Sequence, residues 1–354
     1  MEQYQNPQSQ QQNEEILYLS FNQDQECFSC GTEQGFVIYN TDPFQHIYNR
    51  DFGGGIGIVE MLNRCNIIAL VGGGKQPKFA PTKVQLWDDN QLKRIAEMNF
   101  RSEVKGVKLR ETCIIVVLET KIYAHNFSDL RLFDTINTCP NPLGLCSINT
   151  KGNFMILASP HKNVGEVNVK FYEEDRTVVI KAHQSALNCL QLNHNGSKLA
   201  TASQKGTLIR IYNTQKGEIL QELRRGSEYA QIYSIAFHPK GKYVACSSDS
   251  GTIHIFMLLQ QQGIVDDVEE NNQEVKQNPK STLKFLKFIV PYFDNERSFA
   301  QCKIGEYKSK ITFDQNNGII AITYQGQVYQ GKFNVENGGE FVPQCFSMNK
   351  QDQQ

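Results

Sequence analysis

The feature that most constrains the fold is a pattern of four short β-rich runs that repeats along almost the whole chain. The runs are rich in Val, Ile, Leu, Phe and Tyr, and Gly, Asn, Asp and Ser separate them. They form seven groups of four, and the first run of each group recurs about every 40 to 48 residues until the sixth group. Because one propeller blade is one four-stranded sheet, a repeat of this kind is typical of a β-propeller.

The sequence therefore predicts an all-β fold, a WD40-like seven-bladed β-propeller of four-stranded antiparallel blades. Gly206, Gly251 and Gly326 each lie between the second and third runs of their groups, where a tight hairpin requires a positive φ. Only Trp87 with Asp88 reproduces the WD dipeptide. The seven groups span residues 17–52, 56–100, 104–136, 143–183, 187–225, 232–304 and 310–346.

The predicted domain organisation is one propeller between two polar tails. Residues 1–14 are Gln-rich and are expected to be a flexible tail, residues 15–348 a single propeller, and residues 349–354 a second short tail. A long insertion at about 258–297 interrupts blade six. The start of the chain has no secretory signal pattern, and its apolar runs are too short to cross a bilayer, so we expect a cytoplasmic protein.

Composition excludes several classes of function. Lys and Arg total 36 and Asp and Glu total 37, giving a formal charge of −1, whereas coating nucleic acid requires a strong basic excess. There are ten cysteines, and Cys27 and Cys30 form the only close pair. Without a second Cys or His pair at suitable spacing they do not form a zinc site, so we expect reduced core thiols and no metal.

No sequence motif indicates catalysis. The glycines at 53–57 lack the following helix of a dinucleotide-binding fingerprint, and those at 72–74 lack the spacing of a P-loop. No nucleophile with a neighbouring base, and no pair of carboxylates, is placed for acid–base chemistry. We therefore predict a protein that is not an enzyme and has no cofactor.

The most unusual element is the pair Arg224 and Arg225 at the end of the fifth group, followed by Gly226. Adjacent side chains on an extended strand point to opposite faces, so one guanidinium reaches the side of blade five and the other that of blade six. Arginine suits phosphate because its planar group donates paired hydrogen bonds. The structural alternative is a solvated pair of charges that protects a strand edge.

Blades five and six carry matching polar residues near this pair. When the two blades are aligned on Gly206 and Gly251, Ser203 matches Ser248 and Thr207 matches Thr252. Hydroxyls, basic side chains and one arginine on each side favour binding of a phosphorylated, hydroxylated ring. The structural alternative is that such His and Ser residues belong to the hydrogen-bond network of a WD40 scaffold.

The sequence resembles the PROPPINs, seven-bladed propellers that bind phosphoinositides. The resemblance rests on LRRG at 223–226, IYSIAF at 232–237, SSDSGTIHIF at 247–256, LVGGGK at 70–75 and KVQLWDD at 83–89, and it extends over about 17–348. It implies two rim pockets for phosphatidylinositol 3-phosphate and the 3,5-bisphosphate. The first pocket would contain His183, Ser203, Lys205, Thr207, Arg210 and Arg224. The second would contain Arg225, Ser247, Ser248, Ser250, Thr252 and His254. The carboxylate of Glu228 lies near the second pocket, and its orientation affects the strength of that pocket.

The second half of the blade-six insertion mixes lysines with large apolar residues. We expect its apolar residues to enter the lipid interface while Lys280, Lys284 and Lys287 meet anionic headgroups. In the family the corresponding loop is a membrane-insertion element. The alternative is that the apolar residues pack back on the propeller. The predicted insertion residues are Leu283, Phe285, Leu286, Phe288, Ile289, Val290, Tyr292 and Phe293.

The resemblance implies a phosphoinositide-binding effector that scaffolds autophagy and endosomal membrane traffic. Its partners would be phosphoinositide-containing membranes and an autophagy lipid-transfer protein that contacts loops of blades two and three, near 77–83. We expect a monomer that is cytoplasmic and peripheral to the phagophore, autophagosome, endosome or vacuole. The alternative is a soluble WD40-type scaffold that contacts only proteins.

Overall fold

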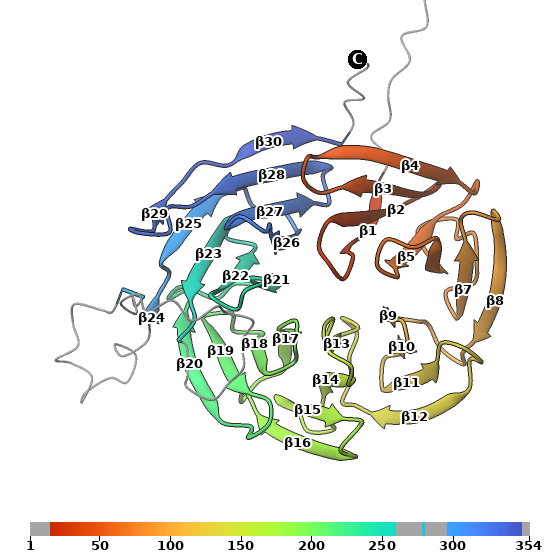
Figure 1. Ribbon diagram of the computed structural model, residues 1–354, viewed down its shortest axis with the longest axis horizontal. Helices are drawn as coiled ribbons and strands as arrows, with labels where there is room; N and C mark the ends of the chain where they lie inside the picture. The colour runs from red at the N-terminus through yellow and green to blue at the C-terminus, as the bar shows by residue number, and fades with distance from the viewer. Residues whose placement is uncertain (1–14, 260–277, 280–295, 349–354) are drawn as a thin grey trace, which may run out of the picture.

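Seven sheets of four or five strands surround a common axis in the computed structural model of the chain (Figure 1). The structure describes residues 15–259, 278–279 and 296–348. In each sheet four strands follow one another in chain order from the axis to the rim, and these strands pair antiparallel. The predicted all-β propeller of seven four-stranded blades is confirmed.

The first four blades occupy the N-terminal half of the chain. Blade one contains β1 (Ile16–Phe21), β2 (Cys27–Thr32), β3 (Gly35–Asn40) and β4 (Gln45–Asp51). Blade two contains β5 (Ile56–Met61), β6 (Ile67–Gly72), β7 (Lys83–Asp88) and β8 (Lys93–Asn99). Blade three contains β9 (Gly106–Arg110), β10 (Cys113–Val117), β11 (Lys121–Asn126) and β12 (Leu132–Asn137). Blade four contains β13 (Ser147–Ile148), β14 (Ile156–Pro160), β15 (Glu166–Phe171) and β16 (Arg176–Lys181).

The last three blades carry the arginine pair and the insertion. Blade five contains β17 (Leu187–Leu192), β18 (Lys198–Ser203), β19 (Leu208–Asn213) and β20 (Ile219–Arg224). Blade six contains β21 (Ile232–Phe237), β22 (Tyr243–Ser248), β23 (Thr252–Met257) and β25 (Ala300–Lys303). Blade seven contains β26 (Ser309–Phe313), β27 (Gly318–Thr323), β28 (Gln327–Lys332) and β30 (Gln344–Ser347).

Two further strands were not predicted. β24 (Glu296–Arg297) pairs in parallel with β20 of blade five, and β29 (Gly339–Glu340) pairs in parallel with β25 of blade six. A strand of two residues has no alternating pattern from which it could be recognised. Each of the two adds a fifth strand at the rim of its blade.

The hydrophobic core lies between neighbouring blades. Side chains alternate between the two faces of each sheet, so that every blade packs one face on each neighbour. Ile209 and Leu223 of blade five, for example, pack with Ile235 and Phe256 of blade six, and all four are at most 4 % exposed. Full burial of a side chain of this size contributes about 1.5 to 3 kcal/mol. Apolar packing of this kind therefore fixes the position of blade five relative to its neighbours.

The ring closes between blade seven and blade one through packing and a side-chain contact. Leu19 and Phe28 of blade one lie in one apolar cluster with Ile322 and Val328 of blade seven. The Gln330 amide, also in blade seven, donates to the backbone oxygen of Thr41 of blade one at 2.6 Å. The first and last blades are accordingly neighbours in the ring (Figure 1).

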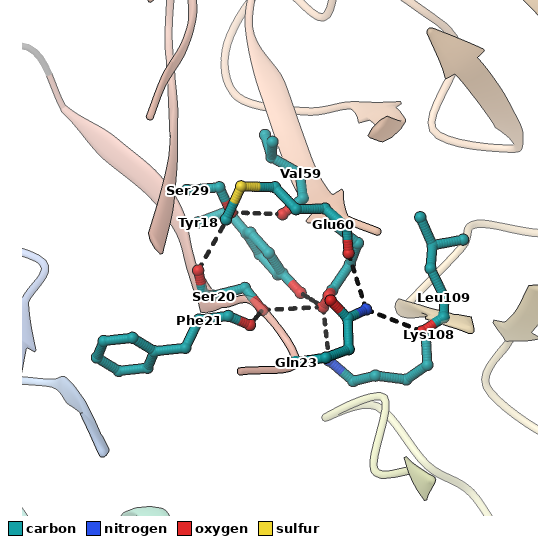
Figure 2. Close-up of polar contacts among 10 residues, drawn as sticks. Tyr18, Ser20, Phe21, Gln23, Ser29, Val59, Glu60, Lys108 and Leu109 are labelled. Carbon is teal, nitrogen blue, oxygen red and sulfur yellow. Dashed lines mark hydrogen bonds and ion pairs between the residues drawn. The ribbon is translucent and has the colours of Figure 1, made fainter. Parts of the chain in front are cut away.

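A cavity of about 200 Å³ follows the axis, and all seven innermost strands contribute to its lining. Glu60 of β5, which is 4 % exposed, is the acceptor of a polar cluster in this channel (Figure 2). Its Oε1 accepts from the Lys108 ammonium at 2.5 Å, the Tyr18 hydroxyl at 2.6 Å and the Ser20 hydroxyl at 3.1 Å. Three donors on a single oxygen compensate for burying the carboxylate.

All ten cysteines are free thiols. Cys27 packs in the core between blades one and two, and Cys30 packs toward blade seven. Two residues three apart on one strand thus lie on opposite faces, as expected for core cysteines. Burial raises the pKa of the Cys146, Cys246 and Cys302 thiols to about 12, so these three stay protonated at neutral pH.

Candidate functional site

Arg224 and Arg225 lie at the outer end of blade five and face different neighbours. Arg224 pairs with Leu208 in the register of β19 and β20. Leu223, one residue before it, is packed between blades five and six. Because side chains alternate, Arg224 faces blade four and Arg225 faces blade six. The Arg225 Nε donates to the backbone oxygen of Gly206, in the β18–β19 turn of blade five, at 3.0 Å, and this contact holds its guanidinium in place. Its charge acts on His254 and Cys246 of blade six.

The face of blade five toward blade four carries a row of polar side chains. The register places Thr201, Arg210 and Glu222 side by side on β18, β19 and β20. Ser203 and Arg224 lie two residues further along β18 and β20, and are therefore on the same face. We call this row, with His183, the first group. Thr207 precedes Leu208, and its backbone oxygen accepts from the Arg225 N–H at 3.0 Å, so it lies level with Arg225 and not with Arg224. Alternation therefore directs the predicted first-pocket residue Thr207 toward blade six.

Arg210 connects the first group to blade four. Its Nε donates to Glu222 Oε1 at 2.7 Å, and its Nη1 donates to the backbone oxygen of Ala182 at 2.6 Å. The next residue, His183, has its Nε2 at 3.0 Å from the Thr201 hydroxyl. Two contacts hold Arg210 in one orientation, so its charge has a fixed position on this face.

Burial, followed by the nearby charge of Arg210, lowers the pKa of His183 to about 4. The ring is therefore neutral at physiological pH. A neutral imidazole offers one N–H donor and one acceptor, and it does not add a positive charge to the first group. The positive charge of this face comes from its arginines.

The second group lies on the face of blade six toward blade five. His254 pairs with Cys246, and Ser248 and Thr252 lie two residues from these on the same face. The hydroxyls of Ser248 and Ser250 are 2.8 Å apart. Burial, followed by the charge of Arg225, lowers the pKa of His254 to about 4. Arg225 therefore lies beside the second group, as Arg224 lies beside the first.

The structure does not bring Ser247 to the second group. Ser247 is adjacent to Ser248 on β22 and faces blade seven, where it is 1 % exposed. Its hydroxyl has no hydrogen-bond partner in the part of the chain that the structure describes. Alternation along the strand is the physical reason for this difference from the predicted site.

Lys205 and Glu228 lie on the exposed rim near the pair. The Lys205 ammonium is 6.0 Å from the centre of the Tyr229 ring, which is 75 % exposed. The backbone oxygen of Glu228 accepts a hydrogen bond from Arg225 Nη2, whereas its carboxylate accepts from the Ser227 hydroxyl at 3.4 Å. Glu228 thus helps to hold Arg225 through its backbone, and its carboxylate is directed to Ser227.

A buried amide anchors the blade-six insertion at the rim. The side chain of Asn278 is 3 % exposed and makes two hydrogen bonds of 2.7 Å with the backbone of Met257. Its amide also donates to Glu296 Oε2 at 2.6 Å, and the Gln221 amide donates to the same oxygen at 3.1 Å. The insertion is therefore attached to β20, the strand that ends at Arg224.

Four neighbours of the two groups were missed in the sequence. Thr201 lies two residues before Ser203, and Glu222 lies two residues before Arg224, so each shares a face with a predicted site residue. The period of two along a strand could have identified both. Arg297 and Ser298 come from the far end of the insertion, and no local signal connects them to the pair. β24 places Arg297 opposite Arg224, and the Ser298 hydroxyl lies 3.3 Å from His254 Nδ1.

Two other regions were predicted to contact a membrane or a protein partner. The predicted membrane-insertion residues between 283 and 293 lie outside the described residues. The segment at 77–83 leads into β7. Residues 77, 78 and 80 are exposed and the others are half-buried, and the Lys78 ammonium donates to the backbone oxygen of Phe52 at 2.6 Å. Within the described ranges no helix is long and apolar enough to span a membrane, and no group of three metal-ligating side chains occurs.

The arrangement can bind anions at two places along one rim. The first group contains two arginines and one carboxylate, with hydroxyls beside them, and the second contains one arginine with hydroxyls and a neutral imidazole. Paired donors of this kind match the oxygens of phosphate. The fold and these groups define a class of protein: seven-bladed β-propellers with an arginine pair divided between two neighbouring blade boundaries.

The chain belongs to the PROPPIN family, whose family model matches residues 16–273. Autophagy-related protein 18e of Arabidopsis thaliana is 36 % identical over 333 residues, covering 92 % of this chain and 86 % of the relative. SVP1-like protein 2 of Pichia angusta is 39 % identical over 336 residues and covers 91 % of both chains. Autophagy-related protein 18 of Yarrowia lipolytica is 32 % identical and covers 92 % of this chain and 94 % of the relative.

Solved structures show the same fold. The crystal structure of Hsv2 from Kluyveromyces marxianus matches with a TM-score of 0.74 at 22 % identity, covering 95 % of this chain and 99 % of the other. A structure described as a complex of KlAtg21 with the coiled coil of AgAtg16 matches with a TM-score of 0.74 at 24 % identity, covering 94 % and 99 %.

Proposed function

We propose that this PROPPIN is a phosphoinositide effector that recruits protein partners to membranes marked with 3-phosphorylated lipid. The ligands are phosphatidylinositol 3-phosphate and the 3,5-bisphosphate, and the protein acts by binding, without catalysis, cofactor or nucleic acid. The observation that carries the proposal is the division of Arg224 and Arg225 between two neighbouring groups of hydroxyls and imidazoles.

The first pocket is formed by His183, Ser203, Arg210 and Arg224, with Lys205 at its exposed edge. The second is formed by Arg225, Ser248, Ser250, Thr252 and His254. In each pocket the arginine meets a phosphate with paired hydrogen bonds, and the hydroxyls and the imidazole meet the other polar groups of the inositol ring. The Glu228 carboxylate accepts a hydrogen bond from the Ser227 hydroxyl at 3.4 Å.

Membrane binding is expected to combine three weak contacts. Two pockets on one rim bind two headgroups of the same membrane, which raises the effective concentration for the second event. The apolar residues at 283–293 enter the lipid interface, and each lysine among 280, 284 and 287 contributes about 1 kcal/mol near an anionic surface. We propose that the rim with blades five and six rests on the membrane while the other blades face the cytoplasm.

Relatives named as autophagy-related proteins support a role in autophagy. The complex of a structural neighbour with a coiled coil supports an autophagy protein as a partner. We propose that the segment at 77–83 contacts an autophagy lipid-transfer protein, and that the protein is a monomer at the phagophore, autophagosome, endosome or vacuole surface.

Flotation with vesicles tests the proposal. The wild type should float with phosphatidylcholine vesicles that contain phosphatidylinositol 3-phosphate, and the double variant Arg224→Thr, Arg225→Thr should remain at the bottom. The matched control replaces exposed arginines of blades two and three, Arg94→Thr and Arg131→Thr, whose side chains are 54 % and 83 % exposed. Thermal unfolding confirms that each variant is folded. Equal flotation of the folded double variant and the wild type would instead favour a scaffold that contacts only proteins.

A deletion separates the two parts of the membrane contact. Removal of residues 283–293 should weaken flotation and leave binding of the water-soluble headgroup inositol 1,3-bisphosphate unchanged, because the pockets lie outside that segment. Equal loss of both kinds of binding would refute an insertion role for these residues.

A further inference from the structure

The end of the insertion runs alongside the arginine pair. β24 pairs in parallel with β20, so that Glu296 lies opposite Leu223 and Arg297 opposite Arg224. The following residue, Ser298, occupies the level of Arg225. We call residues 296–298 the return limb, because here the insertion returns to blade six. A segment that follows the arginine pair by about seventy residues in the sequence thus lies directly beside the proposed pockets.

The contacts of the return limb establish which way each residue faces. The Glu296 carboxylate accepts from Gln221, which is two residues from Leu223 and faces blade six. Ser298, two residues after Glu296, has its hydroxyl 3.3 Å from His254 Nδ1 of blade six. Arg297 lies between them and therefore faces the opposite side, together with Arg224 and the first group. Its side chain is exposed.

The charges of the first group favour an anion at this position. Arg210, Arg224 and Arg297 bring three guanidinium groups to one face, and Glu222 is the carboxylate paired with one of them at 2.7 Å. Like charges on directly paired residues repel each other. A phosphomonoester, which carries about −1.5 to −2 at neutral pH, is an anion that neighbouring guanidinium groups bind with paired hydrogen bonds. A phosphate between Arg224 and Arg297 would relieve that repulsion.

We propose that the return limb supplies one residue to each headgroup pocket, Arg297 to the first and the Ser298 hydroxyl to the second. This inference rests on the proposed function and identifies two of its ligand-binding residues. The ligand chemistry is a phosphomonoester, and the source is the inositol headgroup. The same three residues carry the insertion back to the propeller and are held by Asn278 and Gln221 through Glu296. Headgroup binding and anchoring of the insertion therefore depend on one short strand.

The test is calorimetric titration with inositol 1,3-bisphosphate, which needs no membrane. Arg297→Gln should weaken binding about tenfold, the size expected for the loss of one charge-assisted hydrogen bond. Arg297→Lys should recover only part of it, because an ammonium lacks the planar fork. The matched control is Arg131→Gln, at an 83 % exposed arginine of blade three. Unchanged affinity of folded Arg297→Gln would overturn the assignment.

A double-mutant cycle links Arg297 to the first pocket. Arg297→Gln should have a smaller effect in an Arg224→Thr background than in the wild type, because both residues act on the same phosphate. Its effect should be full in an Arg225→Thr background. Ser298→Ala should give the reverse pattern. Equal, additive effects in both backgrounds would show a general charge effect and overturn the division between pockets.

Two further outcomes distinguish failure of the return-limb assignment from failure of the proposed function. Failure of the wild type to bind the headgroup would refute the proposed function itself, whereas wild-type binding that is insensitive to Arg297 and Ser298 refutes only the role of the return limb. Inorganic phosphate is titrated in parallel. Equal affinity for inorganic phosphate with the same dependence on Arg297 would assign the site to free phosphate and overturn its assignment to a lipid headgroup.

Discussion

Acidification should destabilise this propeller through three histidines whose pKa the fold lowers to about 4: His183, His238 and His254. Burial is the largest cause for each, followed by the charge of Arg210 for His183 and Arg225 for His254. The folded protein keeps these rings neutral, whereas the unfolded chain takes up protons near the ordinary value of about 6.5. Their contribution to stability is therefore complete above about pH 6.5 and is lost as the pH falls toward about 4.

The expected loss follows from the shift. A histidine with pKa values of about 6.5 unfolded and 4 folded loses about 2 kcal/mol of stability between about pH 7 and pH 5. His238 is 1 % exposed and should approach this value. The rings of His183 and His254 are partly exposed, so about 1 to 1.5 kcal/mol is expected for each. The total is about 4 to 5 kcal/mol, a large part of the stability of an ordinary domain.

Urea unfolding at several pH values between about 7 and 5 measures this loss. His183→Gln, His238→Gln and His254→Gln should each reduce the pH dependence by the amount given for that residue. Carboxylates contribute in a lower range: the hydrogen bond from Lys83 lowers the pKa of Glu97 to about 2, so that its contribution is lost only below about pH 4.5. A wild-type stability that does not change between about pH 7 and 5 would refute this reasoning, as would variants that all keep the full dependence.

Two substitutions test other parts of the structure. Gly206 and Gly53 both have φ of 62°, but a Cβ at Gly206 would overlap the backbone oxygen of Ala230, whereas nothing lies within 4 Å at Gly53. Gly206→Ala should therefore lose at least about 1 kcal/mol more stability in urea unfolding than Gly53→Ala, since both pay the same backbone strain; equal losses would contradict the overlap. Lys108→Met leaves the buried Glu60 without its ammonium partner (Figure 2) and should cost about 3 kcal/mol in the same assay. The double variant with Glu60→Gln should recover part of this loss, and a Lys108→Met variant as stable as the wild type would show that the channel pair is unimportant.

Strand periodicity predicted most of the fold because each blade repeats the same local pattern. The same periodicity predicts that Arg224 and Arg225 face different blades. The register places Arg224 beside Leu208, and the charge of Arg225 acts on His254 of blade six. The periodicity also separates Ser247 from Ser248, and applying it there would have removed Ser247 from the predicted pocket. The side to which Ser247 points could therefore have been predicted from the sequence alone.

The return limb could not be predicted from the sequence. β24 has two residues, and its pairing with β20 joins segments on either side of the insertion. The anchor at Asn278 depends on the backbone of Met257 and on Glu296, which come together only when blades five and six have packed. The positions of Arg297 and Ser298 therefore depend on tertiary pairing, which no local sequence pattern indicates.

In the proposed function the two arginines serve two separate pockets. The most direct test is the stoichiometry of inositol 1,3-bisphosphate binding, measured by calorimetry on the folded protein without a membrane. Two separate pockets predict two bound headgroups for the wild type, one for Arg224→Thr, one for Arg225→Thr and none for the double variant. A single headgroup in the wild type, lost equally in either single variant, would contradict it.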